Sequence, residues 1–202
     1  MTFEEIKSIL KNHTVGIAGA GGLGSNCAVA LSRVGVGKLI IADFDVVNET
    51  NLNRQYFFKH QLGEKKVSAL KNNINRINPE TEIIIHDLKL NENNLVNIYK
   101  DCDIIVEAFD IAEMKQIIIE TCMSKLPDKP LIIGSGIAGW GKSNEIRIRQ
   151  SENLYICGDE MTETSTQNPP LAPRVGIVAN MQANTVLEIL LNTNHKDEDY
   201  AE

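Results

Sequence analysis

The chain has 202 residues, of which 43% are hydrophobic and 23% are charged, and its formal net charge is −7. These values are typical of one globular domain and exclude a disordered chain, a collagen-like repeat and a disulfide-rich miniprotein. The acidic balance lacks the basic field of a general nucleic-acid groove, so we do not expect nucleic acid as a partner.

Strands alternate with helices through the first two thirds of the sequence. In chain order, the pattern predicts a helix at 3–12, a strand at 14–18, a helix at 25–34, a strand at 38–42, a polar loop at 46–59, a helix at 64–77, a strand at 82–85, a helix at 92–99, a strand at 103–107, a helix at 114–123 and a strand at 131–134. This alternation predicts an α/β fold with a Rossmann-like, doubly wound and mainly parallel sheet.

The pattern changes after residue 134. Segments at 136–141, 143–149 and 153–156 predict antiparallel strands, followed by a polar crossover loop at 158–173 and a closing helix at 175–191. We expect a single domain over 1–202, made of an N-terminal helix (1–13), a core (14–134), an antiparallel extension with the crossover loop and closing helix (135–194) and a frayed acidic tail (195–202).

Localisation and metal content follow from what the sequence lacks. No apolar run approaches the ~20 residues of a membrane span, and the N-terminus has no apolar core of a signal peptide. Cysteines stand at 27, 102, 122 and 157 without a C-x-x-C pair. We therefore expect a cytoplasmic protein with no membrane anchor and no structural zinc.

The first motif is a glycine-rich turn between the first predicted strand and the following helix. Gly19, Gly21, Gly22 and Gly24 form a G-x-G-x-x-G pattern, which allows a tight turn and a close approach of the backbone to a phosphate or adenosine. A purely structural turn is the alternative. Asp43 ends the second predicted strand, where a carboxylate accepts both ribose hydroxyls, so an NAD enzyme and an ATP enzyme fit equally well to this point.

The segment after the ribose acid favours ATP. Asn51, Asn53, Arg54 and Gln55 lie close together in the sequence, and Lys66 follows near the start of the next helix. A fixed arginine and a fixed lysine suit a polyphosphate whose charge must be neutralised, and a nicotinamide needs no such pair. The sequence has no P-loop motif, so the phosphates are held in another way.

Two further carboxylates belong to the predicted site. Asp45 follows the ribose acid and is a candidate for nucleotide binding. Asp110 follows the strand at 103–107, at the carboxyl edge of the sheet, where an aspartate can hold Mg²⁺ against phosphate oxygens.

Taken in order, these motifs resemble those of one family. The glycine turn, the acid, N-L-N-R-Q, the lysine and the second aspartate are similar to those of the ubiquitin-activating-like adenylyltransferases of sulfur-carrier proteins, the ThiF and MoeB type, and especially its short ThiF-like subgroup. The resemblance covers most of the chain, through GAGGLGS, DFDVVNETNLNRQ, GEKKV, INP and PRVGIVANMQANTVLEILL.

The resemblance implies an activity and its residues. The C-terminal Gly-Gly carboxylate of a ubiquitin-like sulfur carrier, with the thiamine carrier as the first expectation, would attack the α-phosphate of ATP and release pyrophosphate in the presence of Mg²⁺. The implied catalytic residues are Asn51, Arg54, Lys66 and Asp110, with Asp110 as metal ligand. The implied nucleotide-binding residues are Gly19, Gly21, Gly22, Gly24, Asp43, Asp45, Asn53 and Gln55. A homodimer is also implied, with the apolar face near 29–34 and the N-terminal helix as the expected interface.

The sequence departs from the family pattern in four ways. The two zinc-binding C-x-x-C pairs are missing. The crossover loop has no cysteine for thioester or persulfide chemistry, so Cys157, just before the loop, is the only candidate; the alternative is that Cys157 is a buried strand cysteine. No arginine precedes Arg33, whereas the family supplies an arginine from a partner's N-terminal arm. Lys7 or Lys11 replaces it, another positive group does, or the site works without it. Ile111 stands where the family often has asparagine.

Other functions remain open on the sequence. The same fold could activate another carboxylate, such as a molybdopterin carrier, a peptide C-terminus or a modified tRNA. It could also be a non-catalytic nucleotide-binding relative. An NAD dehydrogenase leaves Arg54, Lys66 and Asp110 without a role.

Overall fold

Short runs of apolar, often β-branched residues form the centre of a seven-stranded sheet, because strands buried on both faces suit a parallel sheet. The computed structural model describes residues 1–198, with side chains as far as residue 192. The central parallel strands are β1 (Thr14–Ala18), β2 (Lys38–Ala42), β3 (Glu82–His86), β4 (Ile104–Glu107) and β5 (Leu131–Ser135).

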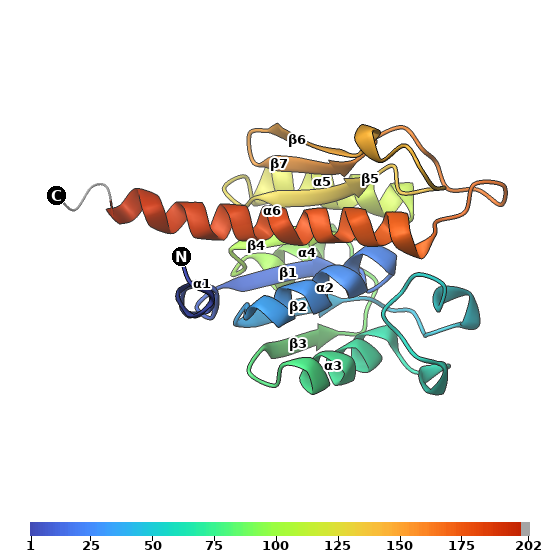
Figure 1. Cartoon of the computed structure of the whole chain (residues 1–202), viewed down its shortest axis with the longest axis horizontal. Helices are drawn as coiled ribbons and strands as arrows, with labels where there is room; N and C mark the ends of the chain where they lie inside the picture. Colours follow the sequence, from blue (N-terminus) through green and yellow to red (C-terminus); the bar gives the residue numbers. More distant parts are fainter. Residues whose placement is uncertain (199–202) are drawn as a thin grey trace.

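The strand order is β3-β2-β1-β4-β5-β7-β6, so the chain adds strands on one side of β1 and then crosses to the other side (Figure 1). This reversal between β1 and β4 creates a topological switch point. Ligands of such folds bind in the crevice at the carboxyl ends of the strands at this point. The Rossmann-like, mainly parallel fold predicted from the sequence is therefore confirmed.

The extension after β5 differs in part from the prediction. β7 (Leu154–Gly158) runs parallel to β5, and only the edge strand β6 (Arg147–Ser151) is antiparallel. The segment 136–141, expected as a strand, forms a loop with one isolated bridge between Ala138 and Pro170. Gly136, Gly139 and Gly141 have positive φ values of 77°, 75° and 67°, which interrupt an extended strand.

Helices cover both faces of the sheet. Their bounds are α1 (Phe3–Leu10), α2 (Gly22–Val34), α3 (Lys66–Ile77), α4 (Glu92–Tyr99), α5 (Ala112–Lys125) and α6 (Ala172–Glu198). In Figure 1, α2, α3 and α6 lie in front of the sheet and α4 and α5 behind it. On the rear face the fully buried Tyr99 donates its hydroxyl to the Ile17 carbonyl at 3.0 Å.

The long helix α6 begins and ends beyond the predicted bounds. It extends to Glu198, because no glycine or proline follows Gly176 to stop it. The first part of the predicted frayed tail is thus helical, and residues 199–202 lie outside the described residues. α6 packs along α2, where Val29 and Leu31 are buried in the core, so this face of α2 is not free to form the dimer interface suggested by the sequence.

No helix within residues 1–198 is long and apolar enough to cross a membrane.

Candidate active site

A pocket of about 370 Å³ opens at the carboxyl ends of β1, β2 and β4, and its volume lies within the ~300–1,000 Å³ of small-molecule sites. One side is formed by residues between 19 and 66, which we name the floor: Gly19, Gly21, Gly22, Asp43, Asp45, Arg54, Gln55 and Lys66. Asp110 lines the same pocket from the loop after β4. The structure therefore brings most of the predicted site residues together around one cavity.

The glycine turn joins β1 to α2 at the bottom of this pocket. Gly19 has φ +104° and donates its N–H to the Ala42 carbonyl at 2.8 Å. Gly21 precedes α2 without a capping side chain, so the first N–H groups of the helix have no cap from that residue. A Cβ on Gly24 would collide with the Gly19 carbonyl oxygen. Gly24 therefore allows close packing of helix and strand, and it does not line the pocket.

Gly21 is the turn glycine at which an added side chain would meet least. Its φ is −79° and its ψ of −149° lies outside the usual helical and extended regions, and an added Cβ would meet only the Gln55 Nε2 atom, at 3.8 Å. Gln55 is 8% exposed, and its Oε1 atom has no hydrogen-bond partner among the residues that the structure describes. The space next to Gly21, which a Cβ would fill, and the nearby buried Gln55 Oε1 atom both suit a ligand that lies against the turn.

Asp43 stands at the end of β2 beside the turn. Its two oxygens accept hydrogen bonds from the N–H of Ala20, at 2.6 Å, and from the N–H of Asp45, at 2.8 Å. Burial raises the pKa of Asp43, and these two hydrogen bonds and Lys66 oppose that rise. The backbone thus fixes the carboxylate at the pocket wall, where its remaining lone pairs can accept ribose hydroxyls.

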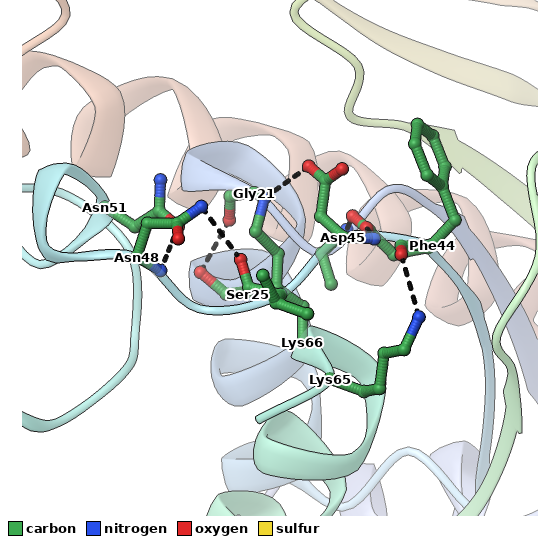
Figure 2. Close-up of polar contacts among 11 residues, drawn as sticks. Gly21, Ser25, Phe44, Asp45, Asn48, Asn51, Lys65 and Lys66 are labelled. Atoms are coloured by element: carbon green, nitrogen blue, oxygen red, sulfur yellow. Dashed lines mark hydrogen bonds and ion pairs between the residues drawn. The ribbon is translucent and has the colours of Figure 1, made fainter. Parts of the chain in front are cut away.

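Two adjacent lysines at the start of α3 point in different directions (Figure 2). Lys66 has a side chain only 7% exposed and places Nζ 2.7 Å from the Asp45 carboxylate. Lys65 instead donates to the Phe44 carbonyl at 3.3 Å and pairs with Asp87 at 3.1 Å. Only Lys66 lines the pocket, so its ammonium is the one available to a phosphate there.

Arg54 contributes a guanidinium to the floor. Its Nη1 atom donates to the Thr50 carbonyl at 3.0 Å and to Asn53 Oδ1 at 2.9 Å. Among the described residues no hydrogen bond or ion pair engages its Nη2 or Nε atoms. This leaves donors for an anion, while the Nη1 contacts hold the side chain in place.

Two predicted asparagines lie outside the pocket wall. Asn51 is 9% exposed and its Oδ1 atom accepts the Asn48 N–H at 2.9 Å, which caps a short 3₁₀ turn (Figure 2). Asn53 binds Arg54. Here these side chains shape the turn that presents Arg54, and their contact with nucleotide or acceptor remains a prediction.

The loop that carries Asp110 is held by a buried ion pair. Glu107 is fully buried, accepts the Phe109 N–H at 2.7 Å and pairs with Lys115 at 2.8 Å. Burial raises the pKa of Glu107, and Lys115 opposes the rise. Asp110 itself is exposed and has no hydrogen bond or ion pair among the described residues, so its carboxylate is available to a cation at the pocket.

The donor set fits Mg²⁺ bound jointly with phosphate. Among the side chains that the structure describes, no group of three or more histidine, cysteine or acidic residues could hold a metal alone. Asp110 and Asp45 both line the pocket, and Mg²⁺ is commonly held by one or two carboxylates together with substrate phosphates. The expected absence of structural zinc stays a prediction.

Neither Cys157 nor Lys7 lines the pocket. The Cys157 side chain is fully buried in β7, and burial raises its pKa to about 11, so the thiolate that reacts is disfavoured. Lys7 pairs with Glu80 at 2.7 Å and does not line the pocket of its own chain. The structure thus favours the reading of Cys157 as a buried strand cysteine.

Sequence reasoning missed most of the apolar pocket wall. These residues are Leu23, Ala42, Phe44, Leu88, Leu90, Ala108, Phe109, Ile111, Met114, Ile137 and Val175. Their sequence pattern is that of ordinary core residues, so no local signal separates them. Thr164, Ser165 and Pro170 of the crossover loop were also missed, because only the folded chain brings them to the floor.

Comparisons with known proteins agree with this geometry. The ThiF family matches residues 3–202. The adenylyltransferase and sulfurtransferase UBA4 of Candida albicans is 30% identical over 93% of this chain and 44% of its own length. The adenylyltransferase and sulfurtransferase MOCS3 of Caenorhabditis briggsae is 32% identical over 89% of this chain and 46% of its own length. The chain thus spans less than half the length of these two curated relatives.

Solved structures show the same fold. The Escherichia coli tRNA N6-threonylcarbamoyladenosine dehydratase TcdA, solved in complex with ATP, superposes with a TM-score of 0.86 at 18% identity, over 96% of this chain and 91% of that one. At that identity the likeness shows the fold alone. E. coli MccB, solved with ATP, gives a TM-score of 0.69 at 25% identity, over 92% of this chain and 57% of that one.

Proposed function

The chain belongs to the ThiF family, and from this membership we propose that it is an adenylyltransferase that uses ATP to activate a carboxylate. The observation that carries the proposal is the floor. It places a glycine turn, a ribose-directed carboxylate, a guanidinium with free donors and a buried ammonium around one pocket.

The proposed reaction is one displacement at phosphorus. A carboxylate oxygen of the acceptor bonds to the α-phosphorus of ATP as the bond to the bridging oxygen breaks, and pyrophosphate leaves with that oxygen. Asp43 orients the ribose, the backbone at Gly21 lies against the nucleotide, and Arg54 and Lys66 neutralise phosphate charge. Mg²⁺, held by Asp110 with help from Asp45, would supply further charge neutralisation when bound.

The proposed acceptor is the C-terminal glycine carboxylate of a ubiquitin-like sulfur carrier, with the thiamine carrier first. We propose that the protein acts in the cytoplasm as a homodimer. Its four cysteines are all unpaired and buried, which supports a reducing compartment. Sulfur transfer is not proposed for the residues described, because their four thiols are buried.

The direct test is exchange of radiolabelled pyrophosphate into ATP in the presence of Mg²⁺. We expect exchange when a carrier ending in Gly-Gly is supplied, and none with a carrier whose last glycine is deleted. Exchange supported instead by the molybdopterin carrier, a peptide C-terminus or modified tRNA would keep the enzyme class and change the acceptor. ATP binding without exchange under all these conditions would contradict the enzymatic proposal and favour a non-catalytic nucleotide-binding protein.

A further inference from the structure

The pocket has a second wall from the last third of the chain. We name it the roof, and it consists of Ile137, Thr164, Ser165, Pro170 and Val175. Ile137 lies in the glycine-rich loop after β5, the next three lie in the crossover loop between β7 and α6, and Val175 lies in the first turn of α6. Three separate segments must therefore stay together for the roof to exist.

Arg174 joins these three segments. Its side chain is 3% exposed and extends from the first turn of α6. Nη1 donates to the Gly141 carbonyl in the loop after β5, at 2.7 Å, and Nη2 forms an ion pair with Asp159, the first residue after β7. A planar guanidinium can serve two acceptors in fixed directions, which a lysine ammonium does less well.

Asp159 also binds the backbone at the start of the crossover loop. Its Oδ1 atom accepts the N–H groups of Met161 and Thr162, each at 2.9 Å, and the Thr162 hydroxyl at 3.0 Å. Burial acts to raise the pKa of Asp159, but these hydrogen bonds and Arg174 outweigh it and lower the pKa. The carboxylate is therefore charged at neutral pH and caps the start of the loop.

The backbone is shaped around this ion pair. Gly136 has φ +77°, and a Cβ there would collide with the Asp159 carboxylate. At the other end of the crossover loop, the Gly139 N–H donates to the Pro169 carbonyl at 3.0 Å, and Ala138 bridges Pro170. The two loops are thus tied to each other as well as to α6.

We propose that Arg174 and Asp159 are positioning residues, whose buried ion pair holds the roof over the floor and thereby sets the affinity of the pocket for ATP. The proposal rests on the proposed function of the pocket. Neither residue lines the pocket, so each acts through others, Arg174 through Val175 and the loop after β5, and Asp159 through the crossover loop.

The first test is Arg174→Lys, which keeps the charge and removes the two-acceptor geometry. We expect the Kd for ATP, measured by calorimetry, to rise about tenfold. Amide hydrogen exchange in the nucleotide-free protein should become about tenfold faster in peptides covering 136–142 and 159–171 and stay unchanged in β1 to β4. The control is Arg149→Lys, because Arg149 forms an exposed pair with Glu160 in the same region, and we expect its ATP Kd to change less than twofold.

A second variant separates positioning from stability. Asp159→Asn combined with Arg174→Met leaves no unpaired charge buried, so its Tm should stay near that of the unaltered protein. The weakened ATP binding should persist, because the bonds to Gly141 and Asp159 are still lost. ATP affinity within twofold of normal in both variants, or faster exchange spread evenly over the sheet, would overturn the proposal. If the unaltered protein does not bind ATP at all, the proposed function fails, and this role of the pair fails with it.

Discussion

The floor and the roof of the pocket are built in different ways. The floor comes from residues 19–66, and backbone hydrogen bonds next to the sheet fix it, such as those to Asp43. The roof comes from three segments between residues 137 and 175, and a buried side-chain pair joins them. The floor is therefore specified mainly by local sequence, and the roof depends on contacts between distant residues. Changes to the floor should alter the fold or the chemistry, and changes to the roof should alter affinity.

The largest effect is expected from removing the floor ammonium. Lys66→Ala should lower pyrophosphate exchange by about 10²–10³-fold, which is the typical loss when one preorganised donor to developing negative charge is removed from an active site. Lys65→Ala is the matched control, since Lys65 binds the Phe44 carbonyl and Asp87 and does not itself line the pocket, and it should keep exchange within about twofold. Equal losses in the two variants would show that Lys66 has no special role.

A pair of glycine substitutions distinguishes a glycine that the fold needs from a glycine that the bound nucleotide needs. Gly24→Ala forces a Cβ into the Gly19 carbonyl and should lower the free energy of unfolding by about 1–3 kcal/mol or more. Gly21→Ala has room in the protein and should lower the unfolding free energy by less than Gly24→Ala does, while ATP affinity falls about tenfold. Denaturant titration and calorimetry measure the two quantities. Normal ATP binding by Gly21→Ala would contradict the position given to the nucleotide.

A smaller effect is expected from pH. The raised pKa of Asp43 means that its carboxyl gains a proton at a higher pH than an ordinary aspartate, whose pKa is about 3.9. Folding stability from this group is therefore present at low pH and lost as pH rises through the raised pKa, whereas ATP affinity should fall on acidification as the ribose acceptor is neutralised. Calorimetry of the unaltered protein and Asp43→Asn from about pH 7 downwards separates this from the titration of ATP itself. Parallel pH profiles would argue against the ribose contact.

The smallest effect is expected from a substitution of Cys157, which lies in β7 and does not line the pocket. Cys157→Ser should keep exchange within about twofold, because the thiol is buried and burial raises its pKa to about 11, which disfavours the reactive thiolate. Loss of exchange in a variant with a normal Tm would show that the thiol takes part in the reaction.

The sequence predicted the floor well because its signals are local. The parallel strands, the glycine turn and Asp43 follow from apolar runs and from residue types that only certain turns accept. The place of Asn51 at the ligand came from the family resemblance and stays a prediction. The structure adds that its Oδ1 atom accepts the Asn48 N–H and caps a turn.

The roof could not be predicted in this way. Residues 136–141 have strand-like apolar positions, but positive φ at the glycines turns them into a loop. No local pattern indicates the role of Arg174, because its partners Asp159 and Gly141 are distant in the chain. The length of α6 was also underestimated, since its polar end lacks an apolar pattern and yet contains no residue that stops a helix.

We propose above that a carboxylate attacks the α-phosphorus of ATP in this pocket. The most direct measurement uses an acceptor carrier whose C-terminal carboxylate is labelled with heavy oxygen, followed by mass spectrometry of the AMP released when the activated carrier is cleaved at its carbonyl carbon. We expect the AMP to gain one labelled oxygen, and Lys66→Ala to slow this transfer by about 10²–10³-fold. Unlabelled AMP, or ADP as the product, would contradict it.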